Sequence, residues 1–182
     1  MYLAVIAGIF LVLVKSATTE SIQSPWLAIP PYIFLLYGVA TIILLTFLLW
    51  SKRFQPMLVS LHFFLSLSLV LFVYPLGFGF DPFIHQATEK IILATGSLTP
   101  KPFYYVGQYS LVVWLAYWSG LPVKYLDSWL LPLLASLFLP SVIYYSFREN
   151  FRSNARAVNI LPLVFLAWPY ATLIQTTPQG LS

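Results

Sequence analysis

The sequence of 182 residues contains no cysteine and very little charge. The lack of cysteine excludes disulfide bonds, cysteine-ligated zinc sites and catalysis by a thiol. Charged residues make up only 8% of the chain, whereas an ordinary soluble domain carries about 25%. Internal repeats, low-complexity tails and a separate soluble domain are not apparent in the sequence either.

What the sequence has instead is apolar and aromatic side chains. Hydrophobic residues account for 60% of the chain and aromatic residues for 18%, and the mean hydropathy is +0.86. A chain of this composition predicts an all-α fold, a polytopic membrane helical bundle. We therefore expect a multi-pass integral membrane protein, in a bacterial plasma membrane.

Four apolar runs are candidates for membrane-spanning helices, each of which needs roughly 20 apolar residues. They cover residues 28–50, 57–77, 128–147 and, as a shorter run, 159–175. A further apolar run, Met1 to Val14, lacks a basic start and a small-residue cleavage site. We predict a helix there rather than a cleaved signal peptide, so that residues 1–56 hold two N-terminal apolar segments.

Positive charge is concentrated between apolar runs and predicts the orientation of the chain. The net charge is +4, and most basic residues fall in two short clusters, Lys52-Arg53 and Arg148, Arg152 and Arg156. Because basic loops favour the cytoplasm, we expect both clusters on the cytoplasmic side, with the arginines free to contact anionic lipid. No basic stripe or patch suggests nucleic acid as a partner.

This orientation requires one inward crossing, by residues 128–147, between the two basic clusters. The apolar run 106–122 is then interfacial or re-entrant, and it is rich in aromatic residues of the kind that anchor a membrane surface: Tyr104, Tyr105, Tyr109, Trp114, Tyr117 and Trp118. We predict that residues from about 78 to 127 form one outer loop of interfacial amphipathic helices.

The outer loop opens with the segment GFGFDPFIHQATEK, where polar groups gather after a long apolar run. Asp81-Pro82 is typical of a helix start, and Gly96 of a helix end. Helical phase places Asp81, His85, Thr88 and Glu89 on one face, opposite Phe83, Ile84, Ala87, Ile91 and Ala94.

This face supports two interpretations. In one, Asp81 only caps the helix while His85 and Glu89 form a solvated face. In the other, the carboxylates and the imidazole are catalytic, because burial or a neighbouring charge can tune a carboxylate as a general base. Asp81 and Glu89 together with His85 also suit a hard cation, so Mg²⁺ or Mn²⁺ stays open as a cofactor, although this spacing is a weak metal signature and we assign no metal ligands.

Other polar residues have both a functional and a structural interpretation. His62 lies within an apolar run, where a hydrogen bond to a neighbouring helix is the simpler explanation for an ionisable group. Lys101 is suited either to a lipid phosphate or to extension along the membrane surface. Gln108 and Tyr109 either line a substrate pocket or are ordinary interfacial residues.

Two stretches of this loop resemble the first extracytoplasmic loop of type-C membrane glycosyltransferases. They are GFD followed by an amphipathic helix and a glycine, at residues 79–96, and PKPFYYVGQYSLV, at residues 100–112. The superfamily includes oligosaccharyltransferase catalytic subunits, protein O-mannosyltransferases and bacterial transferases that use polyprenyl-phosphate sugars. The resemblance covers roughly residues 57–182.

The resemblance implies an enzyme that transfers a sugar from a polyprenyl-phosphate donor to an acceptor glycan, lipid or protein on the extracytoplasmic face. The position that matches the family's catalytic acidic residue is Asp81, with His85 and Glu89 as the nearest assisting groups. Lys101, Gln108 and Tyr109 are then candidates for substrate binding. Membrane lipid is the other expected partner.

Two features depart from the family pattern. Two apolar segments precede the helix that leads into GFD, and the chain is shorter than family members. We therefore expect residues 57–182 to be the start of a longer membrane domain, truncated at its C-terminus. A transporter or lipid-handling protein without catalysis is the main alternative, and a non-catalytic membrane scaffold is a further one. Prolines within the apolar runs, at positions 132, 140, 162 and 169, suit a transporter.

Overall fold

The computed structural model of the chain describes residues 1–20, 22–51, 53–75, 81–97, 105–149 and 155–167. Within these ranges all regular structure is helical, which confirms the predicted all-α fold. The elements in chain order are α1 (Tyr2–Lys15), the 3₁₀ helix η1 (Pro25–Leu27), α2 (Tyr32–Trp50), α3 (Pro56–Val73), α4 (Asp81–Thr95), α5 (Val106–Ser119), α6 (Val123–Arg148) and α7 (Ala155–Phe165).

Three of these helices, α2, α3 and α6, are long and apolar enough to cross a membrane. They correspond to the predicted runs 28–50, 57–77 and 128–147. The first run forms helix only from Tyr32, after two prolines, and the third begins earlier than predicted, at Val123. The predicted N-terminal helix is present as α1, and α7 covers the first part of the fourth run, whose residues beyond 167 lie outside the described part.

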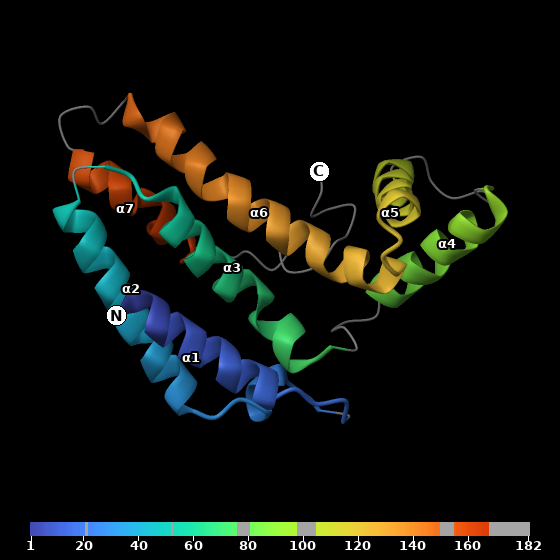
Figure 1. Cartoon of the computed structure of the whole chain (residues 1–182), viewed down its shortest axis with the longest axis horizontal. Coiled ribbons are helices and arrows are strands. Elements are labelled where there is room, and N and C mark those ends of the chain that lie inside the picture. The colour runs from blue at the N-terminus through green and yellow to red at the C-terminus, as the bar shows by residue number, and fades with distance from the viewer. Residues whose placement is uncertain (21, 52, 76–80, 98–104, 150–154, 168–182) are drawn as a thin grey trace.

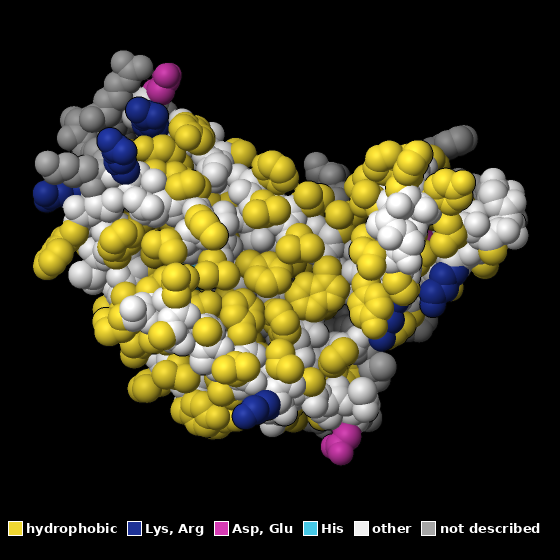
Figure 2. Space-filling model, viewed as in Figure 1, with side chains coloured by type: hydrophobic (Ala, Val, Ile, Leu, Met, Phe, Trp, Pro, Cys, Tyr) yellow, Lys and Arg dark blue, Asp and Glu magenta, His cyan; other side chains and the backbone are white. Residues whose placement is uncertain are grey.

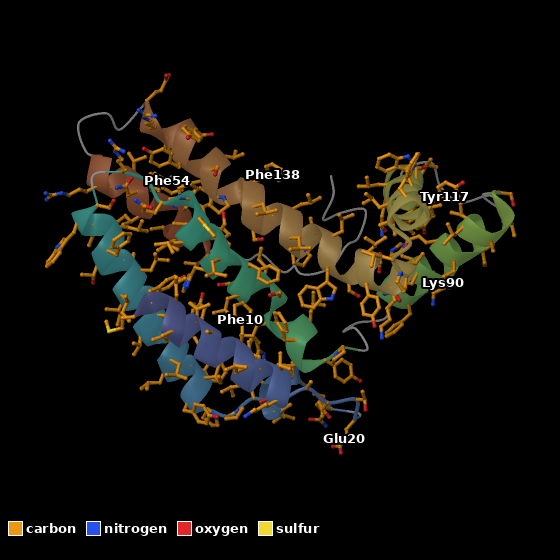
Figure 3. All side chains as sticks on the ribbon, viewed as in Figure 1. Phe10, Glu20, Phe54, Lys90, Tyr117 and Phe138 are labelled. Atoms are coloured by element: carbon orange, nitrogen blue, oxygen red, sulfur yellow. The ribbon has the colours of Figure 1, made fainter. Side chains whose placement is uncertain are left out.

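The long helices form an elongated bundle in which α3 and α6 run antiparallel along each other (Figure 1). Buried residues of α1, α2 and α3 form most of the apolar core, and α6 and α7 contribute Ile143 and Leu163. Aromatic rings pack between the helices: Phe10 of α1, labelled in Figure 3, lies 5.2 Å from Phe72 of α3, measured between ring centroids. Phe72 in turn lies 5.0 Å from Trp129 of α6.

The α2–α3 connection and the end of α6 lie at the same end of the bundle (Figure 1). The ring of Phe54 stacks on that of Tyr144, with centroids 4.1 Å apart. The side-chain amide of Asn159, buried in α7, donates to the carbonyl oxygens of Leu48 and Ser51 at 3.4 and 3.1 Å. Lys and Arg side chains gather at this end in Figure 2. The described members of the two basic clusters therefore lie at one end, as the charge pattern predicts.

Helices α4 and α5 lie at the opposite end, beside the first turns of α6 (Figure 1). A glycine follows each of them with a left-handed backbone: φ is 67° at Gly96 and 68° at Gly120. Glycine adopts this conformation without the steric cost that a Cβ atom brings. The predicted helix from Asp81 to Gly96 is confirmed, and α5 (14 residues) is too short to cross a membrane by itself.

Candidate functional site

Helix α4 turns its polar side inward and its apolar side outward. Its buried residues are His85, Gln86 and Glu89, while Phe83 and Ile91 are about half exposed. Helical phase correctly predicted that His85 and Glu89 share a face. The interpretation of that face as solvated is wrong, because α5 and the start of α6 cover it. The outward apolar side chains suit a helix whose outer surface meets lipid rather than water.

Four buried side chains from α4, α5 and α6 form an acid–amide cluster: Gln86, Glu89, Gln108 and Asp127. The amide nitrogen of Gln108 donates to Glu89 Oε1 at 3.4 Å and to Asp127 Oδ1 at 3.3 Å. The amide nitrogen of Gln86 donates to Asp127 Oδ2 at 3.0 Å. One carboxyl group, that of Asp127, therefore accepts hydrogen bonds from two helices at once.

The two carboxyl groups of the cluster are almost completely shielded, with exposed fractions of 0% for Glu89 and 1% for Asp127. Burial, reinforced by the neighbouring Asp127 carboxyl, raises the pKa of Glu89 to about 9, and the hydrogen bond from Gln108 opposes part of this shift. Glu89 is therefore protonated at neutral pH. Its Oε2 atom is buried and has no hydrogen-bond partner among the residues that the structure describes.

An aromatic group adjoins the acid–amide cluster. His85 Nδ1 lies 2.9 Å from the hydroxyl oxygen of Tyr109, at hydrogen-bond distance. The rings of Tyr105 and Tyr109 stack with centroids 5.8 Å apart, and Tyr105 also lies 5.4 Å from the His85 ring. Burial raises the pKa of the Tyr109 phenol, so that this hydroxyl stays protonated and able to donate at neutral pH.

The structure brings together four of the six predicted site residues. His85, Glu89, Gln108 and Tyr109 are buried neighbours at the α4–α5 contact. Asp81 is the first residue of α4, one turn before His85, and its side chain lies outside the described residues. Lys101 lies outside them altogether.

Two members of the cluster, Gln86 and Asp127, were not predicted as site residues. Asp127 stands at the end of the predicted outer loop, about 78–127, but in the structure it lies within α6 and is buried. A signal was present in the sequence. Asp127 directly precedes a long apolar run, a position where a carboxylate is either exposed at the surface or paired inside the protein.

The described residues contain no group of three or more histidine, aspartate and glutamate side chains that could hold a metal ion. Within the cluster, the side-chain amides of Gln86 and Gln108 occupy three of the four carboxyl oxygens of Glu89 and Asp127. This arrangement can hold three helices in a fixed relation, and it needs no ion to do so.

A second buried polar group lies within the bundle and involves His62. Its Nδ1 atom is 3.3 Å from the hydroxyl of Tyr2 in α1, and its Nε2 atom is 3.1 Å from Thr41 Oγ1 in α2. The ring of Tyr37 stacks on the imidazole at 5.0 Å. The prediction that His62 is hydrogen-bonded to a neighbouring helix is confirmed, and its partners come from two helices.

An apolar groove of about 530 Å³ lies between α1, α3 and α6. Its lining includes Leu3, Leu61, Phe64 and Leu137 and no member of the acid–amide cluster. The acid–amide cluster therefore lies apart from this groove, at the α4–α5 end. Comparison of the chain with protein families, with curated proteins and with solved structures found no match.

Proposed function

We propose that the protein is a membrane glycosyltransferase of a bacterial plasma membrane. It transfers a sugar from a polyprenyl-phosphate donor to an acceptor on the extracytoplasmic face. The observation that carries this proposal is the order of elements around Asp81. An apolar helix, α3, ends at Val73, α4 begins at Asp81, and α4 and α5 pack together over buried carboxyl groups before the chain re-enters the bundle as α6.

This arrangement supports the resemblance to type-C glycosyltransferases, in which an acidic residue stands early in the first outer loop. A carboxylate at the start of α4 belongs to a helix with an outward apolar side, suited to the membrane surface. A lipid-linked donor would present its phosphate and sugar at that surface. The position of Asp81 in the chain thus suits a reaction between a lipid-bound and an external substrate.

In the proposed reaction, the Asp81 carboxylate takes the proton of an acceptor hydroxyl as the hydroxyl oxygen attacks the anomeric carbon. The bond from that carbon to the phosphate oxygen breaks, and the polyprenyl phosphate leaves with the electron pair. Attack from the opposite face inverts the anomeric configuration. Lys101 neutralises the leaving phosphate, whereas His85, Glu89, Gln108 and Tyr109 are buried around α4 and position the helix.

The second candidate is a transporter or lipid-handling protein without catalysis. Its support is the apolar groove of about 530 Å³ between α1, α3 and α6, together with Pro132 and Pro140 inside α6. A lipid-handling protein would depend on the groove and would tolerate changes at the start of α4. Substitutions in the two places therefore separate the two functions.

The test compares the full-length wild-type protein with Asp81→Asn in membranes supplied with radiolabelled polyprenyl-phosphate sugars. Loss of the base is expected to lower sugar transfer roughly 10²- to 10⁴-fold. Lys90→Gln is the matched control, because Lys90 is an exposed charge on the same helix and its removal should leave transfer unchanged. Wild-type transfer by Asp81→Asn at normal expression would refute the assignment of Asp81. Transfer by neither protein, with any donor of this class, would favour the lipid-handling alternative.

A further inference from the structure

Helix α4 is attached to the rest of the protein in an unusual way. Surface helices are ordinarily held by an apolar stripe that faces the core. Among the described side chains of α4, the buried ones are His85, Gln86 and Glu89, all of them polar. None of the α4 side chains that the structure describes belongs to either apolar core cluster, of which the second joins α5 and α6.

Hydrogen bonds from these buried polar side chains, together with the ring contacts of His85 to Tyr105 and Tyr109, therefore hold α4 against its neighbours. His85 pairs with Tyr109 and Glu89 with Gln108, both in α5. Gln86 donates to Asp127, and this side-chain hydrogen bond joins α4 to α6, one of the long helices of the bundle. Because α6 extends through the bundle, the bond to Asp127 fixes the position of α4 relative to the bundle.

We propose that Asp127 is a positioning residue that sets the place of α4 and, with it, the place of Asp81 at the first turn of that helix. This inference rests on the proposed function, and it names a residue that the reaction needs without contact to the substrate. Asp127 acts by accepting from Gln86 at 3.0 Å and from Gln108 at 3.3 Å. It thereby joins α4, α5 and α6 at one carboxyl group.

The role depends on the acceptor chemistry of a carboxylate. Both oxygens of an ionised aspartate accept hydrogen bonds, whereas an asparagine offers one acceptor oxygen and one donor nitrogen. With the amides of Gln86 and Gln108 in their observed orientations, Asp127→Asn keeps the bond from Gln108 and sets an amide nitrogen against the amide nitrogen of Gln86. Since both groups are buried, the lost hydrogen bond leaves two donors facing each other.

In the contact between Gln86 and Asp127, the donor and the acceptor can be exchanged by two substitutions. In the double variant Gln86→Glu with Asp127→Asn, the amide introduced at position 127 donates to the carboxylate introduced at position 86. The remaining oxygen at position 127 still accepts from Gln108. The side-chain sizes and the total charge are unchanged, so that only the direction of one hydrogen bond is reversed.

The experiment measures the position of α4 without reference to activity. Because the chain has no cysteine, two introduced cysteines carry spin labels cleanly: Lys90→Cys on α4 and Val142→Cys on α6, both at exposed positions. We expect a narrow distance distribution in the parent, a broadened or shifted one with Asp127→Asn, and a restored one in the double exchange variant. Lys124→Gln, a charge change in the same turn of α6, should leave the distribution unchanged.

Sugar transfer is then measured on the same variants without the labels. Asp127→Asn should lower kcat by roughly tenfold to a hundredfold, the equivalent of one hydrogen bond to a charged group, with the KM for the donor little changed. The exchange variant should recover most of this loss, which a residue that touches the substrate would not. If Asp127→Asn fails to fold, recovery of folding in the exchange variant supports the same contact.

An unchanged distance distribution in folded Asp127→Asn would overturn the inference, and so would an exchange variant that recovers neither position nor folding. Unchanged transfer by Asp127→Asn with a displaced α4 would show that the place of the helix does not govern the reaction. If the wild-type protein transfers no sugar while the distances behave as expected, the proposed function fails and the structural role of Asp127 stands.

Discussion

Replacement of Glu89 by glutamine tests whether a buried, protonated carboxyl group lies between α4 and α5. The folded protein raises the pKa of Glu89 from an ordinary value of 4.5 to about 9. The folded state therefore holds a proton that the unfolded state releases at any pH between these two values. Stability must then fall as the pH rises from about 4.5 to about 9, because unfolding becomes coupled to proton release.

The size of this pH dependence follows from the release of one proton per molecule on unfolding. Within this window the free energy of unfolding changes by about 1.4 kcal/mol for each pH unit. The wild-type protein should lose about 3 kcal/mol between about pH 6 and about pH 8 relative to Glu89→Gln, in which position 89 does not titrate. Glutamine keeps an oxygen that can accept from Gln108, so the hydrogen bond to α5 is retained.

The assay is unfolding of both proteins in detergent across this pH range, by denaturant or by heat. The difference between the two proteins isolates position 89, because the other ionisable groups are common to both. Glu20→Gln is the control, since Glu20 is an exposed carboxyl group in the α1–α2 connection (Figure 3). Parallel pH profiles for the wild type and Glu89→Gln would refute the reasoning, since they would mean that Glu89 has the same pKa in both states.

Three further predictions concern the bundle and the membrane surface. Asn159→Ala removes the donor to two carbonyl groups at the end of α2, and thermal unfolding should show a loss of about 1–3 kcal/mol; an unchanged melting temperature would refute this role. His62→Leu removes the imidazole that bonds to Tyr2 and Thr41, whose hydroxyls keep only their bonds to the carbonyl oxygens of Leu58 and Tyr37. Because it breaks contacts to two helices, it should destabilise the protein more than Tyr2→Phe does; the reverse order would contradict the assignment. The indole of Trp118 is exposed on α5, so Trp118→Ser should change stability by less than about 0.5 kcal/mol. It should also reduce the quenching of the protein's tryptophan fluorescence by brominated lipids; equal quenching would place α5 away from lipid.

The sequence predicts the helices well, because local signals decide them. Hydropathy located the long helices, and Gly96 ended α4 where a residue with a left-handed backbone was expected. Charge predicted that the connections flanking Arg53 and Arg148 share one end of the bundle. These signals depend on composition and on near neighbours, which a single sequence contains in full.

The environment of the polar face of α4 could not be predicted in the same way. Helical phase states which residues share a face, and it does not state whether that face meets water or protein. Gln86 and Asp127 are separated by 41 positions in the chain, and Asn159 lies 111 positions from Leu48. Such contacts depend on how the helices assemble, so the sequence did not distinguish Asp127 from the other residues of the predicted outer loop.

The sugar-transfer rate of Asp81→Asn relative to the wild type, at equal amounts of folded full-length protein in proteoliposomes, tests the central claim most directly. The account predicts a rate at least roughly hundredfold lower for Asp81→Asn. Glu89→Gln keeps an oxygen that accepts from Gln108 and so keeps α4 in place, and it should retain most of the wild-type rate. Equal rates for Asp81→Asn and the wild type would contradict the account.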